Sequence, residues 1–159
     1  MVNCCERHVF MFKPFVTLMV GLTTLFFASN SIGSSSVEEA VKKRMEMFKS
    51  SGANIKKLSK IFRSGESSAS VDLVDFHVKW SEEMLHLFPM GSQASTSNGS
   101  DASSDIWRDS SGFKKRVREY NRSSVELKKA LKGKDHALIN KKFEHLVKSC
   151  KSCHKQFRN

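Results

Sequence analysis

Two thiols and an imidazole lie close together near the end of the chain, in the run Cys150-Lys-Ser-Cys153-His154. In a helix, residues three apart lie on the same side of one turn, so both sulfur atoms would face the same neighbour. Cys-x-x-Cys-His is the attachment pattern of c-type haem. The two sulfurs form thioethers with the haem vinyl groups, and the histidine is held under the iron. The motif therefore predicts one covalently bound haem c per chain, with His154 as the proximal metal ligand.

Three other uses of a Cys-x-x-Cys pair stay open but are less favoured. A redox-active pair needs a strand that leads into a helix N-terminus, where the helix dipole lowers the thiol pKa, and here the pair lies near the end of an expected helix. A disulfide between the two thiols would close a very short loop and stabilise the fold little. A zinc site needs further ligands. The candidates His77, His86, His136 and His145 show no paired spacing with the cysteines.

The first 33 residues have the pattern of a secretory signal peptide. A weakly positive start precedes the apolar run 15–28, and small polar residues follow it. The run is shorter than the ~20 residues that a membrane-spanning helix needs. We expect cleavage between about Ala28 and Ser34, export to the periplasm and no membrane span after cleavage, with an uncleaved anchor as the alternative. Cys4 and Cys5 would leave with the signal.

Residues 34–159 form the expected domain, which is long enough for one modest core. Pro and Gly are scarce, at 2 and 8 residues, which argues against a turn-rich all-β chain. Apolar residues recur at helical spacing over about 36–63 and 70–88, and again from Asp105 to Leu131 and from Ile139 to Phe157. The pattern predicts an all-α fold, an antiparallel four-helix bundle with covalently attached haem.

The ends of these helices and one glycine carry further expectations. A capping box from Ser36 to Glu39 predicts the start of the first helix, and Asp135 is the expected N-cap of the last. Gly52 lies on the apolar stripe of the first helix, where a missing side chain leaves room for another group to approach. The polar, low-complexity stretch 91–104 predicts a long mobile loop. Trp80 and Trp107 are expected to be packing residues, with Trp107 against the haem.

Four short segments match one known family: 44–52 in the first helix, Phe88-Pro89, Ile106-Trp107 and the terminal 150–158. Together they resemble the class II c-type cytochromes, the cytochrome c′ family of bacterial periplasmic proteins. The resemblance covers the chain from about Glu38 to Arg158. It implies that Cys150 and Cys153 carry the haem thioethers and that His154 is the proximal ligand.

The resemblance also implies roles for three further residues. Arg44 corresponds to the residue that pairs with a haem propionate, and Arg158 to a basic residue near the proximal imidazole. Phe48 falls at the distal position, which is apolar in five-coordinate members and Met in six-coordinate relatives. Phe48 cannot bind iron, so a five-coordinate haem is expected. Met45 or Met47, on the same helix, would be the ligand in the six-coordinate alternative.

Net charge and the motifs that are missing limit the functions that the sequence predicts. The chain has 27 Lys and Arg against 16 Asp and Glu, a net charge of +11, which can steer an acidic redox partner. No nucleic-acid recognition motif is visible, and no paired carboxylates or nucleophile–base pair indicate an enzyme. We expect one-electron transfer by an exported haem c protein. The alternative is binding or sequestration of nitric oxide or carbon monoxide at the open distal face. Homodimers are common in the family, and the sequence does not decide between monomer and dimer.

Overall fold

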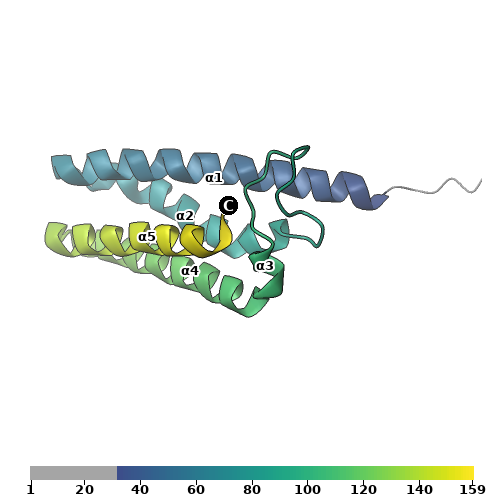
Figure 1. Ribbon diagram of the computed structural model, residues 1–159. Helices are drawn as coiled ribbons and strands as arrows, with labels where there is room; N and C mark the ends of the chain where they lie inside the picture. Colours follow the sequence, from purple (N-terminus) through teal and green to yellow (C-terminus); the bar gives the residue numbers. More distant parts are fainter. Residues whose placement is uncertain (1–31) are drawn as a thin grey trace, which may run out of the picture. The chain divides into compact units, whose positions relative to one another are not determined.

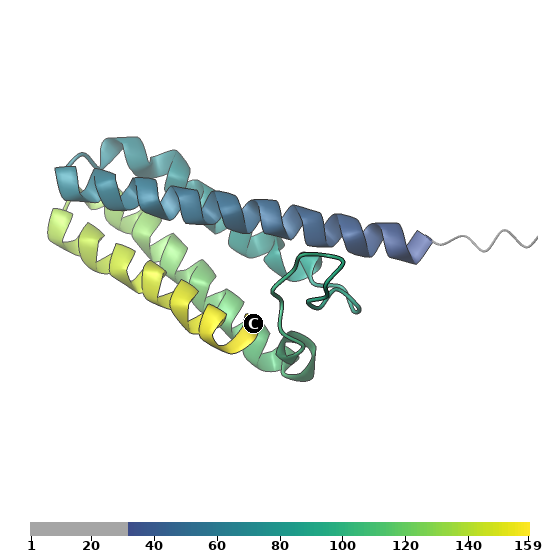
Figure 2. The same ribbon diagram turned by 45° about the horizontal axis from the view of Figure 1, so that its top comes forward.

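The computed structural model describes residues 32–159, and four long helices make up most of that range (Figure 1). They are α1 (Ile32–Ser64), α2 (Val71–Glu83), α4 (Ser110–Gly133) and α5 (His136–Phe157). Successive long helices run in opposite directions (Figures 1 and 2). The predicted antiparallel four-helix bundle is therefore confirmed. The signal-peptide prediction falls outside the described residues, apart from Ile32 and Gly33 in α1, and stays a prediction.

Three short helices and the helix caps complete the secondary structure. Two 3-10 helices, Ser68–Ser70 and Met84–Leu87, flank α2, and α3 (Asp105–Arg108) precedes α4. The predicted cap of α5 is confirmed, because the Asp135 carboxylate accepts hydrogen bonds from the backbone N–H groups of the second and third helical residues, at 2.9 and 3.1 Å. No helix within residues 32–159 is long and apolar enough to cross a membrane.

Two helix boundaries differ from the sequence-based expectation. α1 begins at Ile32, so the predicted capping box at Ser36 lies inside the helix. The single helix expected from Asp105 is interrupted at Asp109, which has φ −116° and ψ 61°. The Asp109 side chain accepts a hydrogen bond from the Gly112 N–H at 2.9 Å and so begins α4 as its N-cap. An aspartate that bonds the backbone ahead of it competes with continuation of the preceding helix.

The core lies between the long helices. The helical spacing over 70–88 predicts a buried face made of Val71, Val74, Val78, Leu85 and Phe88, and the observed face of α2 differs from it in part. Val71 and Leu85 are exposed, whereas His77, Trp80 and Met84 are buried. The backbone changes from α to 3-10 geometry at Met84, so the apolar spacing of a continuous helix does not apply there. The predicted apolar stripes of α4 and α5 are buried or half-buried along their length.

The segment 88–104, which contains the loop predicted over 91–104, is irregular, but it is bonded to other parts of the chain. The backbone N–H of Ala94 bonds the Ala102 carbonyl at 2.9 Å, and that of Ser103 bonds the Phe157 carbonyl at 3.0 Å. A short antiparallel bridge joins Ala102 to Arg158. Figure 2 shows the segment beside the C-terminal end of α5. The segment is therefore tied to the part of the chain that carries the Cys-x-x-Cys-His motif.

Candidate functional site

A cavity of about 620 Å³ opens inside the bundle, within the usual range for ligand sites. Its walls come from α1, α2, α4, α5 and the segment 88–104, including residues 99–102. α1 and α5 make few direct contacts with each other, whereas α4 and α5 pack extensively. The cavity occupies part of the space that separates α1 from α5, so its contents would help to hold these two helices together.

Cys150 and Cys153 both line this cavity from α5 as half-buried free thiols. Burial is the main cause that raises the pKa of each thiol to about 11. Both thiols are therefore protonated at neutral pH, which disfavours the thiolate exchange chemistry of a redox-active pair. Within residues 32–159 no group of three or more His, Cys, Asp or Glu side chains could hold a metal ion, so the zinc alternative finds no ligand set there.

His154 and Phe48 both line the cavity, and their rings contact each other edge to face. Their ring centroids are 6.0 Å apart, with the ring planes at 67°. Phe48 also packs edge-on against Trp80, at a centroid distance of 5.1 Å. The His154 side chain is exposed on one side, and its partial burial, followed by the charge of Arg158, lowers the pKa of the imidazole. A neutral imidazole is the form that can bind a metal.

Arg44 places a buried positive charge in the cavity wall. Its residue is 2% exposed, and its guanidinium lies 4.6 Å from the centre of the Phe88 ring. It donates hydrogen bonds to the Leu87 carbonyl at 3.0 Å, to the Ser100 hydroxyl at 2.8 Å and to the hydroxyl and carbonyl of Ser92. Every one of these acceptors is neutral, and burial lowers the arginine pKa to about 10. An anionic partner would stabilise a buried charge of this kind, for example a carboxylate of a molecule in the cavity.

Arg158 lies at the mouth of the cavity, where it pairs with a loop carboxylate. Its Nε and terminal nitrogen donate to Asp101 Oδ2 at 3.1 and 2.6 Å, and both side chains are exposed. Together with the backbone bridge to Ala102, this pair fastens the segment 88–104 to the end of α5. The resemblance places Arg158 near the imidazole of His154, and the guanidinium charge does reach that ring.

The two methionines named as alternative ligands lie in different surroundings. Met45 lines the cavity but is 41% exposed. Met47 does not line the cavity and packs instead against the hydrophobic core. Of the two, the structure therefore brings only Met45 to the cavity.

A buried polar cluster, absent from the sequence-based expectations, lies behind one wall. The hydroxyl of Tyr120 is 2.6 Å from Nδ1 of His77, and the Ser51 hydroxyl is 3.5 Å from the same nitrogen. Tyr120 and Ser51 line the cavity, and His77 is completely buried behind them. In the sequence, Tyr120 falls on the apolar spacing between Asp105 and Leu131, which predicts burial of its ring but not a polar contact of its hydroxyl. Polar side chains on a buried helix face give no signal in an apolar pattern.

Two further sequence-based expectations concern Gly52 and Trp107. Gly52 lines the cavity, and a Cβ added there would meet no atom within 4 Å, so the approach space expected at this position exists. Trp107 does not line the cavity. Its indole N–H instead donates to the Phe88 carbonyl at 3.2 Å, whereas Trp80 does line the cavity. Trp107 thus contacts Phe88, which lines the cavity, and its contact with the haem stays a prediction.

These residues fit a covalently held haem c. The two motif thiols face the cavity, the imidazole follows them, and open space lies in front of Gly52. The buried charge of Arg44 lacks a carboxylate partner among residues 32–159, and a haem supplies two propionates. Several aromatic side chains also line the cavity, among them Phe48, Trp80 and Phe113.

Comparisons with known proteins point to one family. A family model described as Cytochrome C' matches residues 39–158 of the chain. Among curated protein sequences, none matches.

Three solved structures are similar in fold. Cytochrome c' from Rubrivivax gelatinosus superposes with a TM-score of 0.69 at 20% identity, covering 77% of this chain and 97% of that one. The nitric oxide complex of a mutant cytochrome c prime from Alcaligenes xylosoxidans gives 0.68 at 21% identity, with 77% and 96% covered. A cytochrome c' described as having an unusual ligand-controlled dimer dissociation gives 0.71 at 16% identity, with 77% and 95% covered. Identities this low show likeness of fold alone.

Proposed function

The chain belongs to the cytochrome c′ family, whose members carry covalently bound haem c, and on that premise we propose that it is an exported one-electron carrier. The haem supplies a single iron that changes oxidation state by one electron. Cys150 and Cys153 would hold it through thioethers, His154 would bind the iron, and Arg44 would pair with a propionate. The mature protein would work in the periplasm once residues 1–33 are removed.

One observation carries this proposal: the Cys-x-x-Cys-His motif faces a cavity with mainly apolar, aromatic walls. Phe48, Trp80, Phe113 and Phe157 all line it, and Trp80 has no exposed surface. Apolar walls rearrange little when the charge of a cofactor changes. No nucleophile–base pair supports an enzyme activity in this cavity, so we propose no catalytic reaction.

A redox titration of the purified holoprotein tests electron transfer. We expect a reversible one-electron transition with no change in helical content between the two oxidation states. A protein that loses helical structure on reduction, or that cannot be reduced and reoxidised, would contradict the proposal.

We further propose that the iron is five-coordinate. Phe48 lines the cavity beside His154 and has no atom that can bind iron. The test is an optical and EPR spectrum of the ferric and ferrous protein, before and after carbon monoxide is added. A high-spin spectrum that shifts with the gas is expected. A low-spin spectrum that ignores the gas, and that becomes high-spin in Met45→Leu but not in Met47→Leu, would instead identify Met45 as the sixth ligand.

Binding of a diatomic gas is a second candidate function, favoured by the same Phe48 face. The Phe48 ring covers the cavity but cannot bind the iron, so a small ligand that passed the ring could bind there. One of the structures with a similar fold is a nitric oxide complex. Phe48→Ala removes the ring, so carbon monoxide should associate at least about tenfold faster, equivalent to about 1.4 kcal/mol in the barrier. Phe62→Leu, in the core but not in the cavity wall, is the matched control. Equal rates in both variants would argue against gas entry past Phe48.

Partners and assembly follow as further proposals. Without residues 1–33 the chain keeps 25 Lys and Arg against 15 Asp and Glu, and this net charge of +10 favours an acidic redox partner. A homodimer is proposed because a structure of similar fold is described by its ligand-controlled dimer dissociation. Sedimentation of the holoprotein with and without carbon monoxide would test whether a dimer forms and whether the gas affects it.

A further inference from the structure

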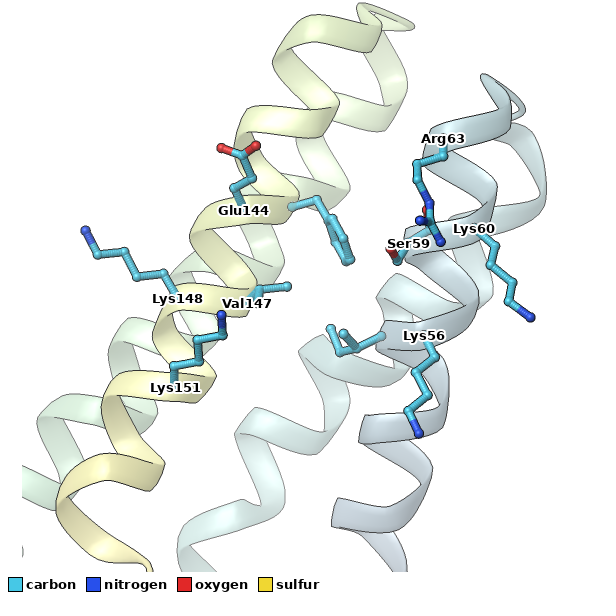
Figure 3. A pocket seen from close by; sticks show the side chains of 10 residues that line it. Lys56, Ser59, Lys60, Arg63, Glu144, Val147, Lys148 and Lys151 are labelled. Carbon is cyan, nitrogen blue, oxygen red and sulfur yellow. The ribbon is translucent and has the colours of Figure 1, made fainter.

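A groove of about 750 Å³ runs between residues 55–63 of α1 and residues 143–151 of α5. Figure 3 shows the cationic side chains of the groove on both helices. They are Lys56, Lys60 and Arg63 from α1, and Lys148 and Lys151 from α5. The groove is thus lined by five cationic residues from two helices that contact each other little, with the ammonium groups of Lys60 and Lys148 extending outward into the surroundings of the groove (Figure 3).

These cations lack acidic partners within the described part of the chain. Residues 32–159 form six ion pairs, and none of them includes a cation of the groove. Glu144 is the one carboxylate that lines the groove, and it takes part in none of the six pairs. Like charges on neighbouring helical turns repel each other. Carboxylates brought by another molecule would therefore be attracted to this surface.

The floor of the groove is apolar. Ile55, Phe143 and Val147 line it and are half-buried. Val147 points into the space between the helices (Figure 3). An apolar centre with a charged rim is the arrangement of protein–protein interfaces. A small inorganic anion would make no use of such a floor, so the surface fits an acidic protein better.

The groove adjoins the cofactor cavity. Ile55, Lys56, Val147 and Lys151 line both spaces. A protein bound in the groove would be separated from the contents of the cavity by no more than these side chains. The position therefore suits exchange of an electron with the cofactor.

We propose that this groove is the docking surface for a one-electron carrier protein whose own cofactor is surrounded by carboxylates. The inference rests on the electron-transfer function proposed above and adds where the partner binds. The cationic rim steers the partner, and the apolar floor fixes its position. One electron would pass from the reduced cofactor of the partner to the ferric haem held by Cys150, Cys153 and His154, with no bond formed or broken and no proton moved. An anionic membrane is the less favoured occupant, because the apolar residues are recessed between helices.

The test uses the ferric holoprotein and reduced flavodoxin, a small acidic flavoprotein, as the probe. The groove variant changes three cations that do not line the cofactor cavity: Lys60→Glu, Arg63→Glu and Lys148→Glu. The control variant makes the same charge change on α4, away from the groove: Lys115→Glu, Lys129→Glu and Lys132→Glu. Stopped-flow absorbance gives the second-order rate constant of haem reduction for each protein.

We expect the groove variant to react about tenfold more slowly than the wild type at low ionic strength, and the control less than about threefold more slowly. The difference should disappear at about 0.5 M salt, where the screening length is only a few ångströms. Equal slowing in both variants would overturn the proposal, because net charge alone would then explain the rates.

Two further measurements separate the alternatives. Riboflavin semiquinone is neutral, so it should reduce all three proteins equally fast. Failure to reduce the wild type would overturn electron transfer itself, and the docking proposal with it. Phosphatidylglycerol vesicles test the membrane alternative. Loss of vesicle binding in the groove variant, with an unchanged flavodoxin rate, would assign the groove to a membrane and overturn docking of a protein.

Discussion

Arg44, Cys150 and Cys153 place polar groups in a wall where polarity is costly. The guanidinium is buried without an acid, and burial raises the pKa of both thiols to about 11. A buried polar group is destabilising unless a partner compensates for the lost water. Thioether formation removes both thiols, and a propionate would neutralise the arginine. Burial of these three groups destabilises the protein without its cofactor, and haem binding would remove that destabilisation.

The first prediction concerns attachment. Cys150→Ala and Cys153→Ala should each leave haem tethered at one point or absent, because each thiol supplies one thioether. Extraction with acidified organic solvent, followed by haem staining of the denatured protein, measures this. Ser152→Ala, between the two cysteines, should keep the haem through the extraction. Full retention of haem in either cysteine variant would show that the motif is not the attachment site.

The second prediction concerns Arg44. Arg44→Leu leaves the buried oxygens of Ser92 and Leu87 without a donor, so urea unfolding should show a loss of about 2–3 kcal/mol. The reduction potential should also fall, since a nearby positive charge favours the ferrous state. Arg44→Lys keeps the positive charge but not all of the hydrogen bonds. Its reduction potential should therefore stay close to that of the wild type, while its unfolding free energy falls. If both variants had the wild-type potential, Arg44 would not act on the cofactor.

Among the elements, apolar spacing identified the helices well, because each long helix turns a continuous stripe toward the core. Cys150, Cys153 and Phe157 on α5 were placed correctly for this reason. The buried face of α2 was not, since His77 there is polar and the backbone changes to 3-10 geometry.

The segment 88–104 shows another limit of pattern analysis. Its order depends on bonds to Arg44 and to the end of α5, which are far away in the sequence. The haem motif and its position could be found from local spacing. The acceptors of Arg44, the pairing of Arg158 with Asp101 and the contribution of Tyr120 to the cavity wall could not.

The third prediction concerns the contact between α2 and α4 that His77 and Tyr120 form. Burial lowers the pKa of His77 from 6.5 to about 4. Between these values the unfolded chain binds one more proton than the folded chain, so stability falls as the pH falls. From pH 7 to pH 5 this histidine should cost about 2 kcal/mol of unfolding free energy. His77→Gln should remove that part of the pH dependence, measured by urea unfolding at both pH values. The same dependence in both proteins would show that His77 does not titrate in this way.

At the scale of the whole molecule, the hydrophobic core draws on every long helix, and the cavity lies beside it. α4 packs closely on α2 and α5, whereas α1 is separated from α5 by the cavity and by the groove beside it. The segment 88–104 closes one end by bonding both Arg44 and the residues after His154. A haem bound there would contact every long helix, so it would act as part of the core.

The fourth prediction tests whether a cofactor occupies that space. Gly52 and Gly133 are both helical, and a Cβ at either would meet no atom within 4 Å. Replacing a helical glycine stabilises a helix by about 0.5–1 kcal/mol, so neither Gly52→Leu nor Gly133→Leu should prevent folding. Of these two glycines, Gly52 lines the cavity and Gly133 does not. Gly52→Leu should therefore lower the ratio of haem to protein in the purified sample, whereas Gly133→Leu keeps it, with circular dichroism confirming the helices of both. A full complement of haem in Gly52→Leu would mean that the cofactor does not approach this turn of α1, and that the open space in front of it has another purpose.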